Sequence, residues 1–118
     1  MAYDSNNIFA RILRGEIPNK TVFESEHVLS FHDAFPKAPV HILIIPKGAY
    51  LDAGDFAANA TDAEKLAFFA AIDTVVTQEN LAANGYRLIA NTGDHGGQEV
   101  PHFHMHILAG EKIGAMRG

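Results

Sequence analysis

The feature that most constrains the fold is a run near the end of the chain in which histidine alternates with apolar residues. In residues 102–107 the histidines occupy every second position and apolar side chains fill the positions between them: His102, His104 and His106, with Phe103, Met105 and Ile107. Side chains of a β-strand point alternately to its two faces. The run therefore predicts a strand over residues 102–108 with three imidazoles on one face and core side chains on the other. Because three adjacent imidazoles fill a core poorly, we expect them to form a functional site.

Metal binding is one chemistry that such a row of histidines suggests. Zinc takes imidazole nitrogens at about 2.0–2.1 Å, whereas the first and third histidines of the strand lie about 13 Å apart at Cα, at roughly 3.3 Å per residue. Two of the three could share an ion, but not all three. The chain has no cysteine, and no carboxylate stands at an obvious ligand spacing. We therefore predict no metal site and no cofactor, with a zinc-binding protein kept as an alternative.

Nucleophilic catalysis fits the row better. A neutral imidazole is a good nucleophile near pH 7, where a serine would need an activating base. Neighbouring histidines can fix its tautomer and donate protons to phosphoryl oxygens. The segment just before the row carries Gly93, Gly96 and Gly97, and glycine lets backbone N–H groups approach an anion closely. The pattern favours attack on a phosphorus atom.

Composition narrows the class of partner. The 118 residues include 9 basic and 14 acidic side chains, for a net charge of −5, and no cluster of lysine or arginine. Nucleic-acid binding normally needs a basic patch, so we expect a small molecule held in a pocket. The longest apolar run, residues 42–45, is too short to span a bilayer, and residues 1–7 lack the pattern of a signal peptide. We expect one domain over residues 1–118, in the cytoplasm and without membrane contact.

The pattern of local signals predicts an α+β fold. A short helix over residues 7–14, capped by Ser5 or Asn6, precedes strands over residues 21–24, 28–33 and 40–45. A long helix follows from Thr61, and strands over residues 86–91 and 102–108 complete the chain, with a loop over residues 92–98 between them. The short connections favour an antiparallel five-stranded sheet with one long and one short helix.

The long helix has a clear start in the sequence. Thr61 and Glu64 match a capping box, and we place its end near residue 83, before Asn84 and Gly85. One side of it collects residues that are apolar with one exception: Leu66, Phe69, Ala70, Asp73 and Val76.

The chain resembles the histidine triad family, whose signature alternates histidine with apolar residues as residues 102–108 do. Further segments are similar to the Hint branch of that family: residues 8–9, 14–18, 31–33, 36–41, 45–47, 85–87 and 91–100. The resemblance covers about residues 6 to 112. It departs from many eukaryotic members at Glu99, where those have serine, and at Pro101, where tyrosine is common. The chain also lacks the tryptophan found near the end of some relatives.

The resemblance implies hydrolysis of purine nucleoside phosphoramidates through a nucleotidyl-histidine, in a homodimer with a HIT-like fold. The position of His104 is the nucleophile, that of His102 orients it through a hydrogen bond, that of His106 contacts the phosphate and that of His41 supports the site. The remaining positions border the nucleotide: Ile8, Phe9, Phe31, Asp33 and Ala34 around the base and ribose, and Asn91, Gly97 and Glu99 near the phosphate and leaving group. A dinucleoside polyphosphate hydrolase and an AMP-binding regulatory module remain as alternatives. The other histidines, His27, His32 and His95, are expected to be structural or solvated.

Overall fold

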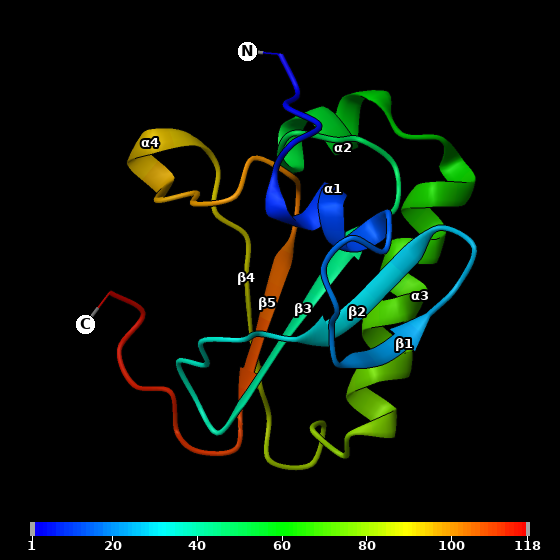
Figure 1. Cartoon of the computed structure of the whole chain (residues 1–118). Helices are drawn as coiled ribbons and strands as arrows, with labels where there is room; N and C mark the ends of the chain where they lie inside the picture. The colour runs from blue at the N-terminus through cyan, green and yellow to red at the C-terminus, as the bar shows by residue number, and fades with distance from the viewer. Residues whose placement is uncertain (1, 118) are drawn as a thin grey trace.

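A twisted antiparallel sheet of five strands organises the molecule (Figure 1). The computed structural model describes residues 2–117. The strands, in the spatial order β1-β2-β3-β5-β4, are β1 (Thr21–Glu24), β2 (Val28–His32), β3 (Val40–Pro46), β4 (Arg87–Ile89) and β5 (Met105–Ala109). The helices are α1 (Ile8–Leu13), α2 (Ala53–Asn59), α3 (Asp62–Gln78) and α4 (Gly93–Gly96). The predicted α+β class and antiparallel five-stranded sheet are confirmed.

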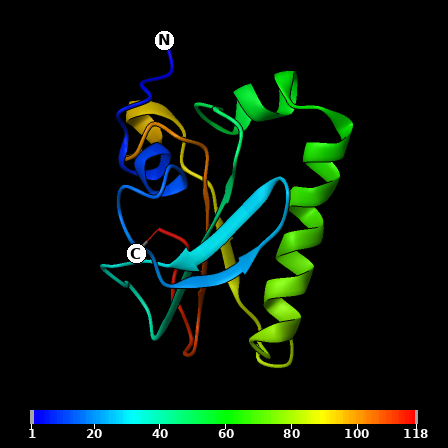
Figure 2. The ribbon, with the colours of Figure 1, turned by 45° about the vertical axis from the view of Figure 1, so that its right-hand side comes forward.

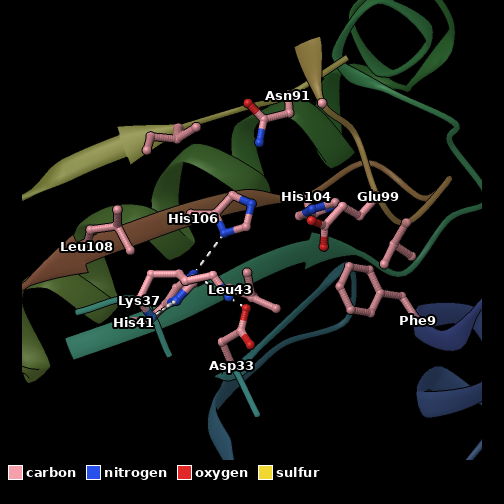
Figure 3. Close-up of a pocket in the computed structure, with 13 residues that line it drawn as sticks. Phe9, Asp33, Lys37, His41, Leu43, Asn91, Glu99, His104, His106 and Leu108 are labelled. Carbon is pink, nitrogen blue, oxygen red and sulfur yellow. Dashed lines mark hydrogen bonds and ion pairs between the residues drawn. The ribbon is translucent and has the colours of Figure 1, made fainter. Parts of the chain in front are cut away.

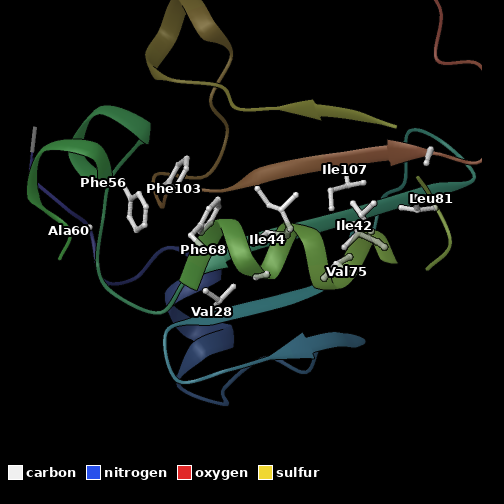
Figure 4. Packing of buried hydrophobic residues seen from close by; sticks show 14 residues of the cluster. Val28, Ile42, Ile44, Phe56, Ala60, Phe68, Val75, Leu81, Phe103 and Ile107 are labelled. Atoms are coloured by element: carbon white, nitrogen blue, oxygen red, sulfur yellow. The ribbon is translucent and has the colours of Figure 1, made fainter. Parts of the chain in front are cut away.

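The main hydrophobic core lies between the sheet and α3 (Figures 2 and 4). Ile42 and Ile44 of β3 and Ile107 of β5 point to this face and have no exposed surface. They pack against one side of α3, which contributes Phe68, Ala71, Ile72, Val75 and Val76. Alternate residues of β3 and β5 therefore form one apolar face. Phe103, just before β5, and Ile107 lie in this core, as the sequence predicted.

The opposite face of the sheet carries the smaller helix α1. Its Phe9 and Ile12 pack on a second buried cluster formed by Leu29, Phe31, Leu43 and Ile45. Asn7 caps α1 by accepting a hydrogen bond from the Ala10 amide at 2.9 Å, so the predicted caps Ser5 and Asn6 are wrong by one or two positions. This face is shared between α1 and a pocket, whereas α3 covers the other face with core.

The long helix differs from its prediction in its end and in its buried side. The capping box of Thr61 and Glu64 is confirmed, but the helix ends at Gln78, because Asn80 adopts a left-handed backbone with φ of 57°. Leu66 and Phe69, expected along one apolar side, are 73% and 65% exposed. Apolar residues occur on nearly every side of α3, so periodicity alone did not select the side that packs.

Two short helices were not predicted, and strand β5, which carries His106, begins three residues later than predicted. Helix α2 lies in the long connection after β3, and α4 lies within residues 92–98, which were predicted as a loop. Strand β5 begins at Met105, not at residue 102, because the Phe103 amide donates to the Tyr50 carbonyl at 2.7 Å instead of joining the sheet. The other strands match to within two residues, with β4 the shortest at Arg87–Ile89. In the described part of the chain, no helix combines the length and hydropathy that crossing a bilayer would require.

Candidate active site

A pocket of about 260 Å³ opens on the α1 face of the sheet, where β3, β4 and β5 run side by side (Figure 3). Its volume is close to the lower end of the range for small-ligand sites, about 300–1,000 Å³. The residues around it come from distant parts of the chain: Phe9, Asp33, Lys37, His41, Leu43, Ile89, Asn91, Gly97, Glu99, Val100, His104, His106 and Leu108. The pocket therefore joins the histidine row to residues from α1, β3, β4 and the loop around α4.

His104 presents a nitrogen lone pair to this pocket. Its Nδ1 lies 2.7 Å from the main-chain carbonyl oxygen of His102. A carbonyl oxygen only accepts, so Nδ1 carries the hydrogen and donates it. Burial lowers the pKa of His104, which keeps the ring neutral. Nε2 is then unprotonated, and the edge-to-face contact with Phe9, at 4.9 Å between ring centroids, supports the ring from one side.

His106 presents the opposite group, an N–H donor, because of a relay behind it. The Lys37 amide donates to Nδ1 of His41 at 3.0 Å, so the hydrogen of His41 is on Nε2. That Nε2 lies 2.8 Å from Nδ1 of His106 and donates to it. His41 and His106 can meet because they are diagonal neighbours on β3 and β5, where Leu43 pairs with His106.

The relay leaves the hydrogen of His106 on Nε2, the ring nitrogen away from His41. Burial, followed by the neighbouring His104 and His41, lowers the pKa of His106 to about 4, so this ring is also neutral. The pocket thus combines an imidazole lone pair on His104 with an imidazole N–H on His106, and the two ring centroids are 5.0 Å apart. A nucleophile and a hydrogen-bond donor at this spacing suit attack on a phosphoryl group.

Asp33, His41 and His106 form the one described group whose ligand atoms come within 4.8 Å of one another, as a metal site would need. The hydrogen bonds of His41 argue against that use. A metal on Nε2 of His41 would require the hydrogen to move to Nδ1, where it would face the Lys37 N–H. Oδ2 of Asp33 lies 3.4 Å from His41 Nε2, close enough to share its hydrogen. The three residues therefore fit a proton-bearing network better than a metal.

The loop around α4 borders the pocket and is held from behind by Gln98. The side-chain nitrogen of Gln98 donates to the carbonyl oxygens of Leu51 and Val100, and its oxygen accepts from the Gly93 amide. Gly97 follows α4 with a left-handed φ of 74°, which favours glycine. Glu99 and Asn91 flank this turn at the pocket. Gln98 gave no signal in the sequence beyond its place in the family-like segment.

The structure brings most of the predicted site residues to one pocket. Those that line it are Phe9, Asp33, His41, Asn91, Gly97, Glu99, His104 and His106. Four others do not line it: Ile8, Phe31, Ala34 and His102. Phe31 contacts the pocket residue Phe9 edge to face, at 5.7 Å between ring centroids. His102 does make the predicted hydrogen bond to His104, but through its main-chain oxygen, while its ring is buried behind the pocket.

Sequence reasoning missed five residues of the pocket wall: Lys37, Leu43, Ile89, Val100 and Leu108. Alternation could have found two of them, since Leu43 shares a face with His41, and Leu108 with His106. Lys37 carried no such signal, because it lies in the irregular segment between β2 and β3.

Comparison with known proteins finds relatives along nearly the whole chain. The sequence model of the HIT domain family matches residues 14–113 of the chain. An uncharacterized 13.2 kDa HIT-like protein of Azospirillum brasilense is 55% identical over 114 residues, covering 97% of this chain and 93% of the relative. The purine nucleoside phosphoramidase of Escherichia coli is 44% identical over 109 residues, covering 92% of this chain and 91% of the relative. These similarities extend over nearly the full length of each protein.

Comparison with solved structures finds the same fold in proteins with these sequence similarities. The crystal structure of a HIT family hydrolase from Legionella pneumophila superposes with a TM-score of 0.85 at 40% sequence identity. The match covers 96% of this chain and 100% of that one.

Proposed function

The chain belongs to the HIT domain family, and on that premise we propose that it is a purine nucleoside phosphoramidase. It cleaves the P–N bond that joins a nucleoside monophosphate to an amine. The E. coli relative that carries this name supports the choice of substrate. The observation that carries the proposal is the hydrogen-bond pattern at one pocket, from which we infer an unprotonated Nε2 on His104 and an Nε2–H on His106.

The reaction follows from these two nitrogens. Nε2 of His104 attacks phosphorus and forms an N–P bond, while Nε2–H of His106 donates to a phosphoryl oxygen. The P–N bond to the amine breaks, and the leaving nitrogen keeps the electron pair and takes a proton from solvent. Water then attacks phosphorus, the bond to His104 breaks, and the proton lost by the water balances the one taken by the amine. The products are the free amine and the nucleoside monophosphate, with both rings neutral again.

The substrate is oriented by residues on both sides of the histidines. We place the purine and ribose toward Phe9 and Asp33, with Ile8, Phe31 and Ala34 behind or beside them, because a carboxylate can accept from two ribose hydroxyls. Asn91, Gly97 and Glu99 face the phosphate and the leaving amine. Lys37 adds a positive charge on the pocket wall that the sequence did not predict.

Steady-state kinetics test the proposal. We expect an adenosine phosphoramidate to be cleaved with a kcat/KM at least about 100-fold above that for a diadenosine polyphosphate, and His104→Ala to abolish turnover. His95→Ala, a change to an exposed histidine of α4, is the matched control and keeps full activity. The reverse preference would move the chain to the dinucleoside polyphosphate hydrolases. AMP binding without turnover of either substrate would favour a regulatory nucleotide-binding module.

We also propose that the chain forms a homodimer through the edge strand β4. Within residues 2–117, strand β4 lies at the edge of the sheet and pairs with β5 alone, and the outer side of an edge strand offers backbone N–H and C=O groups for further pairing. Leu88 lies opposite Ile107 on the α3 face, yet it is 37% exposed. A second copy on this edge would continue the sheet and cover Leu88.

Sedimentation equilibrium tests this dimer. Leu88→Lys should give a monomer, whereas Thr21→Lys, on the other edge strand, should leave the dimer intact. A monomeric parent protein would refute the proposal.

A further inference from the structure

Tyr3 makes a hydrogen bond to His102 across 99 positions of the chain. Its hydroxyl lies 2.5 Å from Nδ1 of His102, and the two rings meet edge to face at 5.6 Å between centroids. Tyr3 does not line the pocket. The His102 ring has no exposed surface at all, so this hydroxyl reaches an imidazole nitrogen that water does not contact.

The direction of this hydrogen bond is fixed by the other end of the ring. Nε2 of His102 lies 2.8 Å from the carbonyl oxygen of Pro46, which can only accept. The hydrogen of the neutral ring is therefore on Nε2, and Nδ1 is an acceptor. The Tyr3 hydroxyl is the donor to it. Tyr3 and the end of β3 thus hold the His102 ring between them.

The anchored residue is the one that orients the nucleophile. The main-chain oxygen of His102 accepts the Nδ1 hydrogen of His104, and this bond decides where Nε2 of His104 points. Residues 102–104 precede β5 and lack its ladder of hydrogen bonds. Their backbone is held by the donation of the Phe103 amide to Tyr50 and by the two contacts of the His102 ring. Loss of one ring contact would loosen the carbonyl that aims His104.

We propose that Tyr3 is a positioning residue for the nucleophile, acting through His102. The proposal rests on the phosphoramidase function proposed above. A shift of the attacking atom by a fraction of an ångström slows a displacement while leaving substrate contacts in place. Tyr3→Phe, which keeps the ring and removes the hydroxyl, should therefore lower the single-turnover rate about tenfold with little change in the concentration for half-saturation. Tyr86→Phe, at an exposed tyrosine, is the matched control and should change neither quantity.

Nitrogen NMR of the histidine rings gives a readout that needs no substrate. In the parent protein we expect His102 to show hydrogen on Nε2 and an accepting Nδ1. In Tyr3→Phe the Nδ1 signal of His102 should shift and the ring signals of His104 should move or broaden, while those of His41 stay in place. This NMR measurement tests the effect of Tyr3 on His102 and His104 even if the parent protein cleaves no phosphoramidate.

Three results would overturn the proposal. One is an unchanged single-turnover rate in Tyr3→Phe, including the case in which the variant only melts at a lower temperature. Another is an effect confined to half-saturation, which would make Tyr3 a binding residue. The third is a parent protein in which Nδ1 of His102 carries the hydrogen, or a Tyr3→Phe variant in which the His104 signals do not change.

Discussion

The two faces of the sheet have different roles, although the same strands, β3 and β5, contribute to both: one face forms the core and the other lines the pocket. On the α3 face, alternate residues of β3 and β5 are apolar and fully buried, with Ile42, Ile44 and Ile107 against the helix. On the α1 face, the residues between them include His41 and His106, joined by a hydrogen bond and open to the pocket. One face stabilises the fold through burial, and the other holds neutral imidazoles in fixed tautomers.

This difference shows how a small chain keeps several buried histidines. Their hydrogen bonds end on groups of fixed polarity, namely the carbonyl oxygens of Pro46 and His102 and the Lys37 amide. Each such partner leaves only one place for the ring hydrogen. The apolar face provides the rigid strands on which this network is built.

The largest effect should come from the α3 face, where two neighbouring phenylalanines form a matched pair. Phe68 is 1% exposed and Phe69 is 65% exposed. Phe68→Ala should lower the free energy of unfolding by about 3–5 kcal/mol because it leaves a cavity. Phe69→Ala should change it by less than about 0.5 kcal/mol. Urea unfolding of both variants measures this, and equal losses would show that α3 buries a different side.

The next effect belongs to the histidines and depends on pH. Burial lowers the pKa of His102 to about 4 in the folded chain, against 6.5 for an ordinary histidine. Below pH 6.5 the unfolded state takes up a proton that the folded state does not, so stability falls as the pH falls. One such group costs about 1.4 kcal/mol per pH unit in this window and nothing above it.

Urea unfolding between pH 6.5 and 5, above the range in which most carboxylates titrate, isolates this loss. His102→Gln should flatten the slope by about one proton, because the variant has no imidazole at this position to take up a proton on unfolding. A stability that stays constant over this window would contradict neutral buried imidazoles.

The smallest effect separates binding from stability on the α1 face. Asp33→Asn should raise the AMP dissociation constant about tenfold, or about 1.4 kcal/mol, because a carboxylate accepts ribose hydroxyls more strongly than an amide does. The free energy of unfolding should change little, since an asparagine oxygen can still accept from the Phe35 amide. Calorimetric titration with AMP measures the change, and Asp73→Asn on α3 is the control. Unchanged affinity in Asp33→Asn would remove Asp33 from the nucleotide site.

Much of the architecture followed from alternation and from caps in the sequence. Period two predicted the core positions Phe103 and Ile107, a buried apolar run that stops at Pro46 predicted β3, and the capping box placed the start of α3. These signals involve only residues close together in the sequence, so they can be recognised without knowledge of the tertiary contacts. The buried side of α3 was predicted wrongly because apolar residues lie around most of the helix, and only the sheet decides which of them pack.

The site was partly predictable for the same reason. The histidine row and the family-like segments named eight of the 13 residues that line the pocket. The histidine row also extended the predicted strand over residues 102–104, where the Phe103 amide donates to Tyr50 instead of joining the sheet. The contact between Tyr3 and His102 had no local signal, because it joins residues 99 positions apart. Lys37 was missed because an irregular segment brings it to the pocket wall.

The proposed reaction depends on a bond between Nε2 of His104 and phosphorus. Mass spectrometry of the protein, quenched at alkaline pH during turnover of an adenosine phosphoramidate, tests it most directly. We predict a species heavier by one nucleotidyl group. Fragmentation should place that group on His104, and the species should not form in His104→Ala. An adduct on His106 or on another residue, or turnover that persists in His104→Ala, would contradict it.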